Sequence, residues 1–427
     1  MKKILLLFIV VLTFQVNAQD NLFKTKDSIA QVKWVDSIMS SMSIDQKIGQ
    51  LLMIPAYSNK DQKHINAIEN AIKKYELGGL IFMQGTAKGH ASLINKYQSK
   101  SKIPLLISID GEWGLDMRIK KTVGFPYNMA LGAIRDDKLI ADFGKRLGQQ
   151  VKRVGIHVNF APVVDINTNP KNPIIGNRSF GEDKYDVTEK SLQFVKGMQS
   201  ENVLACAKHF PGHGDTSQDS HKTLPTVNFS AKRIDSIELY PYYKLFEAGL
   251  GSIMAAHLSI PSLEPNKQLP TSLSYNVVTK IAKDRMQFKG LIFTDALNMK
   301  GATKYYDSGE IEALALSAGN DVLLFPVSVS KAISKIKKQV RKGKIPRERI
   351  EESCRKILEA KYRVGLHTKD KSIAFIKKEN LEKDLNQLVY EVTHRDLIEA
   401  GLTLIRNEKD ILPIKKLKRK QFASLAF

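Results

Sequence analysis

Short apolar segments alternate with longer amphipathic segments through most of this 427-residue chain, and this alternation limits the folds that it can adopt. About eight apolar segments of strand length occur between residues 48 and 325, and helix-like segments separate them. The apolar segments are hydrophobic throughout, so each strand is expected to be buried on both faces, as in a parallel sheet covered by helices. Eight such units predict an α/β fold of the (β/α)8 TIM-barrel type rather than an open doubly wound sheet. The sequence has no Walker-type loop and no glycine-rich dinucleotide turn after a strand, which argues against a nucleotide-binding fold.

The boundaries of the expected elements follow from these patterns. The predicted strands cover residues 48–54, 78–83, 105–109, 157–164, 204–207, 252–256, 291–294 and 321–325. The predicted helices cover residues 27–42, 61–75, 90–100, 138–154, 184–200, 235–248, 275–286, 310–317, 329–342 and 347–362.

The two ends of the chain are predicted to lie outside the barrel, which is expected over residues 27–366. Residues 1–18 combine a basic start, a short apolar core and a small-residue cleavage site, which predicts a signal peptide cleaved after Ala18 and a secreted or periplasmic protein. No other apolar run is long enough to span a membrane, so no stable membrane insertion is expected. Residues 367–427 are interpreted as a linker and the start of a truncated C-terminal α/β domain, with a helix over 381–400 and a strand over 402–405.

The formal net charge of +22 is high for a chain of ordinary composition. A solubilising surface is one interpretation, and attraction to a polyanion such as an anionic cell wall is the other. The basic residues are not interleaved with aromatic side chains in a recognisable motif, so no nucleic-acid partner is expected. Cys206 and Cys354 are predicted to be buried free thiols, although an exported protein could also join them in a disulfide.

Ionisable side chains stand where five of the predicted strands end, and in a barrel these ends meet at one mouth. Each one alone is explained by a helix cap or a turn, but five at one mouth indicate a site. The residues are Asp110, Asp165, the pair Lys208 and His209, His257, and Asp295.

Asp295 and the segment from Lys208 to His221 carry the residue types that glycosidic bond cleavage needs. A carboxylate such as Asp295 can act as the nucleophile of a retaining glycosidase, which also needs a general acid/base nearby. Asp219 beside His221 can fix the imidazole tautomer and raise its pKa, which suits that second role. The glycines at 212 and 214 are expected to let this loop bend and move.

Further side chains of the predicted mouth can hold the hydroxyl groups of a sugar. These residues are Asp110, Arg118, Arg178, Lys208 and His209. Surface salt bridges remain the alternative for both arginines. A metal site remains the alternative for the group His209, His213, Asp215, Asp219 and His221, although the chain lacks the common zinc motifs.

Four motifs, in the same order along the chain, carry a resemblance to a known family. They are Asp110-Gly111-Glu112, Asn177-Arg178-Ser179-Phe180-Gly181, Lys208-His209-Phe210-Pro211-Gly212-His213-Gly214 with Asp219-Ser220-His221, and Phe293-Thr294-Asp295-Ala296-Leu297-Asn298-Met299. Over about residues 35–365 the chain resembles the family-3 glycoside hydrolases, specifically their β-N-acetylglucosaminidase branch.

The resemblance implies a TIM barrel and a retaining mechanism that uses no metal and no cofactor. It implies Asp295 as nucleophile, His221 with Asp219 as acid/base pair, and a carbohydrate containing N-acetylglucosamine as the partner. The sugar-binding residues implied are Asp110, Arg118, Arg178, Lys208 and His209, while His213 is expected to shape the loop. The chain departs from the family pattern at Trp113 and Leu115, which are expected to reshape the rim of the pocket.

The resemblance also bears on the C-terminal region and on the reaction. Residues 400–413 resemble the entry to the α/β sandwich that follows the barrel in two-domain members, and such a domain is predicted to be truncated here. An exported exo-β-N-acetylglucosaminidase acting on peptidoglycan fragments or chitin-type oligosaccharides is the leading hypothesis. The alternatives are a broader β-glycosidase such as a β-glucosidase, a phosphorylase of N-acetylglucosaminides, and a non-enzymatic module that binds the cell wall.

Overall fold

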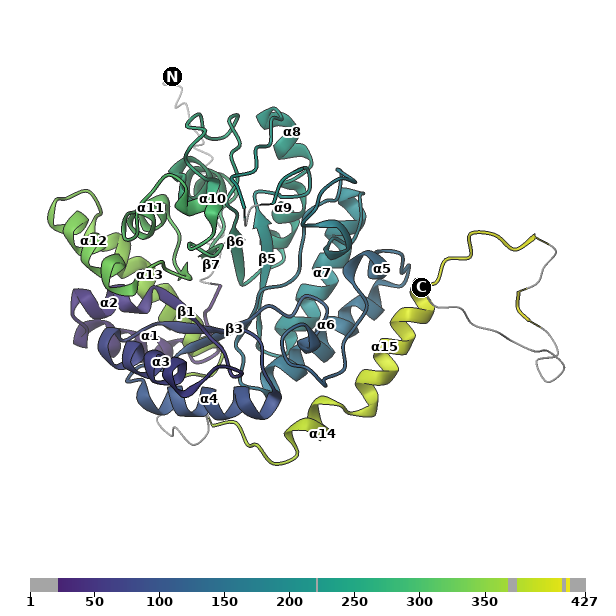
Figure 1. Ribbon diagram of the computed structural model, residues 1–427, viewed down its shortest axis with the longest axis horizontal. Helices are drawn as coiled ribbons and strands as arrows, with labels where there is room; N and C mark the ends of the chain where they lie inside the picture. Colours follow the sequence, from purple (N-terminus) through teal and green to yellow (C-terminus); the bar gives the residue numbers. More distant parts are fainter. Residues whose placement is uncertain (1–21, 220–221, 368–374, 409–411, 415–427) are drawn as a thin grey trace, which may run out of the picture.

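Eight parallel strands form the centre of the protein, and helices surround them (Figure 1). The computed structural model describes residues 22–219, 222–367, 375–408 and 412–414. The strands are β1 (Leu52–Ala56), β2 (Gly79–Phe82), β3 (Leu106–Ile109), β4 (Val158–Asn159), β5 (Leu204–Phe210), β6 (Ser252–Ala255), β7 (Leu291–Thr294) and β8 (Leu323–Leu324). Their side chains are buried almost without exception, as expected for strands covered on both faces.

The helices follow the strands in the order that a (β/α)8 barrel requires, with additional helices at both ends. The α-helices are α1 (Ser28–Ser41), α2 (Ile44–Gln50), α3 (Gln62–Tyr75), α4 (Ala87–Lys100), α5 (Asn128–Gly132), α6 (Asp137–Arg153), α7 (Lys184–Ser200), α8 (Ala231–Ser236), α9 (Tyr240–Glu247), α10 (Lys300–Thr303), α11 (Glu310–Ala318), α12 (Val329–Arg341), α13 (Arg347–Arg363), α14 (Leu381–Leu385) and α15 (Leu388–Gly401). Three 3-10 turns, η1 (Leu115–Met117), η2 (Gly176–Arg178) and η3 (Thr271–Leu273), and the π-helix η4 (Asn276–Arg285) complete the set in the described chain.

The sheet runs in the order β7-β6-β5-β4-β3-β2-β1-β8 and closes on itself. Strand β8 pairs with β1 through Leu52 and Leu323, so the last strand lies beside the first. On its other side, a bridge between Phe293 of β7 and Val322 joins the chain just before β8 to β7. The predicted TIM barrel is therefore confirmed.

Local chemistry explains where the observed elements differ from the predicted ones. Residues 48–50 belong to helix α2 rather than to the first strand, because Ser43 and Gln46 form a capping box that starts a helix at Ile44. Strand β4 is much shorter than predicted, and Pro162 has no N–H group to extend a ladder. Strand β5 is longer than predicted and includes Lys208 and His209.

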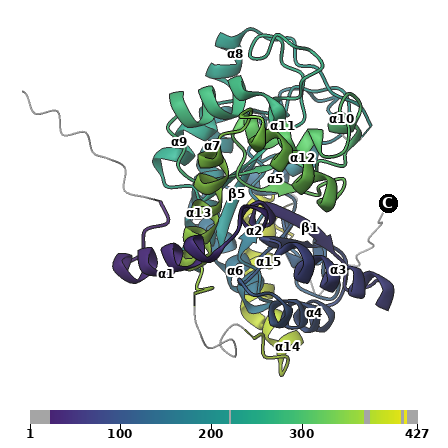
Figure 2. The same cartoon turned by 90° about the vertical axis from the view of Figure 1, so that its left-hand side faces the viewer.

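The C-terminal helices α14 and α15 pack on the outside of the barrel, against α4, α5 and α6 (Figures 1 and 2). The side chain of Gln150 on α6 donates to the carbonyl of Leu385 at 2.9 Å, and Arg153 contacts Asp384 at 2.8 Å. The single helix predicted over 381–400 is thus two helices.

The strand predicted over residues 402–405 is wrong for the described chain. This segment has no regular structure, and the side chain of Ile405 is 94% exposed. A strand is stable only when a neighbouring strand satisfies its backbone hydrogen bonds, and no described segment pairs with this one. A C-terminal sandwich domain stays a prediction.

Three further expectations concern the core and the chain ends. Cys206 and Cys354 are buried and free, which confirms that prediction. Within the described ranges, no helix has the length and apolar composition needed to cross a membrane. The predicted signal peptide, residues 1–18, lies outside the described residues.

Candidate active site

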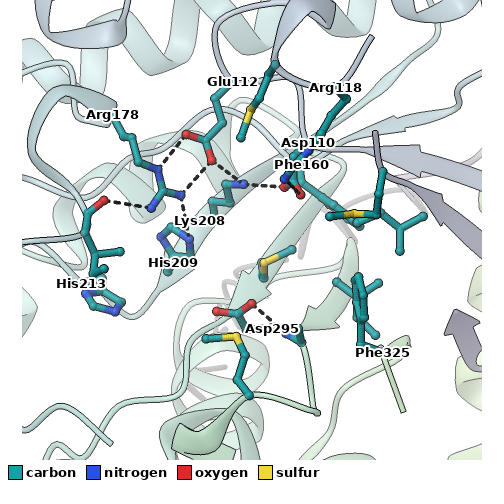
Figure 3. Close-up of a pocket in the computed structure, with 18 of the residues that line it drawn as sticks. Asp110, Glu112, Arg118, Phe160, Arg178, Lys208, His209, His213, Asp295 and Phe325 are labelled. Carbon is teal, nitrogen blue, oxygen red and sulfur yellow. Dashed lines mark hydrogen bonds and ion pairs between the residues drawn. The ribbon is translucent and has the colours of Figure 1, made fainter. Parts of the chain in front are cut away.

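A cavity of about 370 Å³ opens where the strands end, and most of the predicted site residues line it (Figure 3). Side chains from β5 and from the segments that follow β3, β4, β5 and β7 form its charged wall. The charged and imidazole residues that line it are Asp110, Glu112, Arg118, Arg178, Lys208, His209, His213 and Asp295. The structure thus brings together six of the eight predicted site residues.

Lys208 joins two carboxylates on the charged wall. Its ammonium lies 2.9 Å from Asp110 and 2.7 Å from Glu112, and its side chain is only 4% exposed. Burial alone would raise the pKa of Asp110, but Lys208 and Arg118 outweigh burial and hold this pKa below its ordinary value. The same carboxylates raise the pKa of Lys208 against the effect of burial. All these groups are therefore charged at neutral pH.

Arg178 makes a two-pronged ion pair with Glu112. Its Nε and Nη2 atoms donate to the two Glu112 oxygens at 2.9 and 2.8 Å, which is the geometry that makes arginine–carboxylate pairs strong. Turn η2 is itself held by Asn128, which donates to the Arg178 carbonyl at 2.7 Å. The surface salt-bridge alternative is therefore wrong for Arg178: its ion pair lies within the cavity wall.

Arg118 is fixed by Asp110 at the end of η1. Its Nη2 atom donates to Asp110 at 2.8 Å. Its Nε atom is buried, and no described residue accepts its hydrogen. Because buried donors are rarely left without an acceptor, this N–H is a candidate for binding a ligand in the cavity.

His209 is oriented by the buried carboxylate of Asp165. The Nδ1 atom of His209 lies 2.7 Å from Asp165, so Nδ1 carries the proton of the ring. The Nε2 atom is then unprotonated, and it lies 3.4 Å from Nη2 of Arg178. Asp165 also accepts the backbone N–H groups of His209 and His213, at 3.2 and 2.7 Å. Burial would raise the pKa of Asp165, but His209 and these hydrogen bonds hold it below its ordinary value.

Asp295 follows β7 and faces the charged wall (Figure 3). Burial would raise the pKa of Asp295, but His257 and His209 reverse the effect, and the Ala296 N–H, which donates to it at 2.7 Å, adds to the lowering. The pKa is therefore below its ordinary value, and the group is an anion at neutral pH, as a nucleophile must be. His257 holds the segment after Asp295, because its Nε2 lies 3.0 Å from the Ala296 carbonyl.

Apolar side chains form most of the rest of the cavity lining. Four methionines and two phenylalanines are among them: Met83, Met117, Met254, Met299, Phe160 and Phe325. A polar wall that fixes hydroxyl groups opposite an apolar wall that packs on C–H groups suits a sugar ring.

The first half of the loop after β5 is held tightly. Asn172 donates to the carbonyls of His213 and Gly214 at 2.8 and 2.9 Å, and the Thr216 hydroxyl lies 2.8 Å from His213 Nδ1. His213 thus has the loop-shaping role expected of it. Burial, followed by the charge of His209, lowers the pKa of His213 to about 4, so the ring is neutral at pH 7.

The structure gives the two glycines of this loop a packing role, and the predicted role of letting the loop bend and move stays a prediction. A Cβ atom at position 214 would lie 1.7 Å from the Ile166 carbonyl oxygen, and one at 212 would lie 2.5 Å from the Glu238 side chain. Both glycines are therefore needed for close packing of the loop on the barrel.

The predicted acid/base pair is only partly within the described chain. Asp219 is half-buried and is not among the described residues that line the cavity, while His221 lies outside the described residues. Their pairing stays a prediction.

Among the residues that the structure describes, no three His, Cys, Asp or Glu side chains are grouped as metal ligands would be. Asp215, one candidate ligand, is bound instead by Thr168 and by Arg233, which lies 2.9 Å away.

Sequence reasoning missed the importance of Glu112 and left Asp165 and His257 without a role. Glu112 stands within a quoted motif, but its partner Arg178 is 66 residues away, and no sequence pattern pairs them. The positions of Asp165 and His257 after strands were a usable signal, since both support cavity residues.

Comparison with known proteins agrees with this architecture. Residues 43–360 match the model of the glycosyl hydrolase family 3 N-terminal domain. A protein named beta-hexosaminidase A, from Pseudoalteromonas piscicida, is 30% identical over 82% of this chain and 62% of its own length. The chain thus spans less than two thirds of that relative.

Two solved structures share the fold. A family 3 beta-N-acetylglucosaminidase from Paenibacillus sp. str. FPU-7 is 32% identical, with a TM-score of 0.75 over 86% of this chain and 70% of that one. A beta-glucoside phosphorylase, BglX, is 25% identical, with a TM-score of 0.83 over 90% of this chain and 70% of that one. The barrel, the charged cavity at its mouth and the match over residues 43–360 together show that the chain belongs to glycosyl hydrolase family 3.

Proposed function

We propose that the protein is a retaining exo-β-N-acetylglucosaminidase that hydrolyses terminal N-acetylglucosamine from peptidoglycan fragments or chitin-type oligosaccharides. The observation that carries the proposal is the half-buried, ionised carboxylate of Asp295 facing a wall of hydrogen-bonding side chains in one small cavity. A volume of about 370 Å³ is at the lower end for ligand sites, which favours a single terminal sugar over an internal stretch of a polymer.

In the first step, an oxygen of Asp295 attacks the anomeric carbon while the bond to the leaving oxygen breaks. His221, held by Asp219, donates its proton to that oxygen, so the aglycone departs as a neutral alcohol. In the second step, His221 takes a proton from water, the water oxygen attacks the anomeric carbon, and the ester to Asp295 breaks. The sugar leaves with its original anomeric configuration, and both side chains return to their starting states.

The charged wall holds the sugar during both steps. Asp110 accepts hydrogen bonds from sugar hydroxyls, and Arg118, Arg178, Lys208 and His209 complete the set of partners. The buried Nε–H of Arg118 supports this assignment, because a sugar hydroxyl would supply the acceptor that no described residue provides. The similarity to proteins named beta-hexosaminidase and beta-N-acetylglucosaminidase supports the choice of sugar.

The test is a panel of aryl β-glycosides: N-acetylglucosaminide, glucoside and xyloside. The proposal requires the highest kcat/KM for the N-acetylglucosaminide and release of the β-anomer, followed by NMR. A preference for the glucoside contradicts the proposed sugar, and initial release of the α-anomer contradicts the retaining mechanism.

Transfer of the sugar to phosphate is the second candidate, because a structural neighbour is named a beta-glucoside phosphorylase. The same panel with inorganic phosphate distinguishes the two reactions. A phosphorylase forms a sugar 1-phosphate, whereas the hydrolase forms free sugar at the same rate with or without phosphate.

Export of the protein is also part of the proposal. It is supported only by the signal-peptide pattern of residues 1–18. The N-terminal sequence of the mature protein from its native cell tests it, since cleavage after Ala18 leaves Gln19 first.

A further inference from the structure

Two aromatic side chains, Trp113 and Tyr127, lie against each other close to the cavity. Their ring centroids are 4.7 Å apart, with an angle of 54° between the ring planes. Trp113 is partly exposed, and Tyr127 is 49% exposed. Neither residue lines the cavity that holds Asp295, so the pair stands outside the space for the terminal sugar.

Both aromatic residues are sequence neighbours of residues that form or support the cavity wall. Trp113 directly follows Glu112, and Tyr127 directly precedes Asn128, whose side chain donates to the Arg178 carbonyl at 2.7 Å. Because Glu112 and Arg178 are themselves joined by two hydrogen bonds, the backbone segments that carry the two rings are both next to residues of the charged wall. This neighbourhood is the basis for considering the rings as part of the mouth.

The backbone beneath the rings is fixed by buried neighbours. The Trp113 carbonyl accepts the N–H of Phe125 at 2.9 Å, and Phe125 is buried against Phe143, with ring centroids 4.9 Å apart. Leu115, two residues after Trp113, is fully buried. The expectation that Leu115 would reshape the rim of the pocket is therefore wrong. The two rings are therefore held in place while their surfaces stay partly open to solvent.

We propose that Trp113 and Tyr127 form a binding site for a second pyranose ring, the one joined to the terminal sugar through the bond that is cleaved. This inference rests on the proposed function and deepens it, because it makes a saccharide the preferred aglycone. A rigid aromatic surface packs on the C–H face of a pyranose ring and loses little conformational entropy in doing so. The site beyond the cavity thus binds a sugar through its apolar face, whereas the cavity binds the terminal sugar through its hydroxyls.

The kinetic test compares two substrates with alkoxide leaving groups. One is N,N′-diacetylchitobiose, whose aglycone is a pyranose ring, and the other is methyl N-acetyl-β-glucosaminide, whose aglycone has no ring. In Tyr127→Ala and Trp113→Ala, kcat/KM for the disaccharide is expected to fall about tenfold, the size of one aromatic contact, and kcat/KM for the methyl glycoside to stay within about twofold. An equal loss on both substrates would show a structural role only and would overturn the proposal.

The chain offers a matched control, because it has two tryptophans and both pair with a tyrosine. Trp34 of α1 meets Tyr362 of α13 edge to face at 5.8 Å, on the outer surface of the barrel (Figure 2). Trp34→Phe should leave both substrates unaffected.

Two variants with a single tryptophan give a direct binding test by fluorescence. Trp34→Phe leaves Trp113 as the sole reporter, and Trp113→Phe leaves Trp34. A thio-linked analogue of the disaccharide, which resists cleavage, should change the Trp113 emission at concentrations where N-acetylglucosamine alone changes it little, and should leave the Trp34 emission constant. An equal response of Trp113 to the monosaccharide would overturn the second-ring site.

The two hypotheses fail in different ways. If the unmodified protein does not release aryl alcohol from any aryl N-acetyl-β-glucosaminide, the proposed function is wrong. If it does, and Tyr127→Ala treats disaccharide and methyl glycoside alike, only the second-ring site is wrong.

Discussion

Glu112 binds Arg178 with two hydrogen bonds and Lys208 with a third, and its side chain is only 1% exposed. One carboxylate thus fixes two of the cations that line the cavity. Burial would raise the pKa of Glu112, but Arg178 and Lys208 together hold it far below its ordinary value. The shape of the proposed sugar site depends on this one side chain.

The variant Glu112→Gln should therefore lose both stability and activity. It leaves the buried Lys208 and the half-buried Arg178 with one fewer negative partner, and breaking a buried pair typically costs about 3–5 kcal/mol. We expect Tm to fall by several degrees and kcat/KM to fall about a hundredfold or more, because the loss of such an ion pair is worth several kcal/mol. Thermal unfolding and aryl-glycoside kinetics measure the two effects.

Its control is Glu247→Gln, which removes an exposed ion pair with Lys244. Such a pair contributes about 0–1 kcal/mol, so neither Tm nor kcat/KM should change measurably. If Glu112→Gln behaved like this control, the ion-pair network would not organise the site.

Gly214→Ala should disturb the loop that leads to Asp219. The added Cβ would lie 1.7 Å from the Ile166 carbonyl oxygen, so the loop must move away from the barrel. Overpacking of this kind costs about 1–3 kcal/mol, and we expect lower Tm together with lower kcat. The control is Gly124→Ala. There the added Cβ would lie no closer than 3.4 Å to another atom, the Asp116 Cβ, so this variant should behave like the parent. Unchanged kinetics in Gly214→Ala would contradict the close-packing role.

Glu238 should make the stability of the protein fall as pH rises from about 4.5 to about 8. Burial and the neighbouring Asp215 raise the pKa of Glu238 to about 8, although Arg233 opposes the shift from 2.5 Å. In the unfolded chain the pKa is near the ordinary 4.5, so the folded state holds an extra proton between these values. This contribution to stability is fully present below pH 4.5 and is lost as pH rises through about 8.

The measurement for Glu238 is Tm between pH 5 and pH 9 in the parent and in Glu238→Gln. The amide cannot ionise, so the variant should lose less stability than the parent as pH rises. Parallel curves for the two proteins would show that Glu238 does not titrate in this range.

His221→Ala should lower kcat/KM most for the substrates whose leaving group depends most on proton donation. Glycosides with strongly basic leaving groups depend on proton donation, whereas a nitrophenolate leaves readily without it. We expect kcat/KM to fall on the order of a hundredfold or more for the methyl glycoside and much less for the nitrophenyl glycoside. Asp219→Asn is the companion variant and should show a weaker form of the same pattern. A uniform loss on both substrates counts against an acid role for His221.

Much of the fold was predictable, because strand and helix patterns are local. The apolar strands and the residues at their ends predicted a barrel with one charged mouth. Residues 48–50 were assigned wrongly, because a capping box at Ser43 overrides an apolar run that is equally compatible with a strand.

The contacts within the mouth were not predictable to the same degree. Asp295 and Lys208 could be placed from their positions after or within strands. The pairing of Glu112 with Arg178 and that of Asp165 with His209 depend on chain segments that only the closed barrel brings together. The packing role of Gly212 and Gly214 was not predictable for the same reason, since their close neighbours come from other segments.

The central claim is that Asp295 forms a covalent bond to the sugar. A fluorinated N-acetylglucosaminyl fluoride that forms the ester rapidly and releases it slowly should add the mass of one sugar to the protein. Mass spectrometry of the digested protein should then locate that sugar on Asp295, and Asp295→Ala should stay unlabelled. A label on any other residue, or turnover of an aryl N-acetyl-β-glucosaminide by Asp295→Ala at the parent rate, would contradict the account.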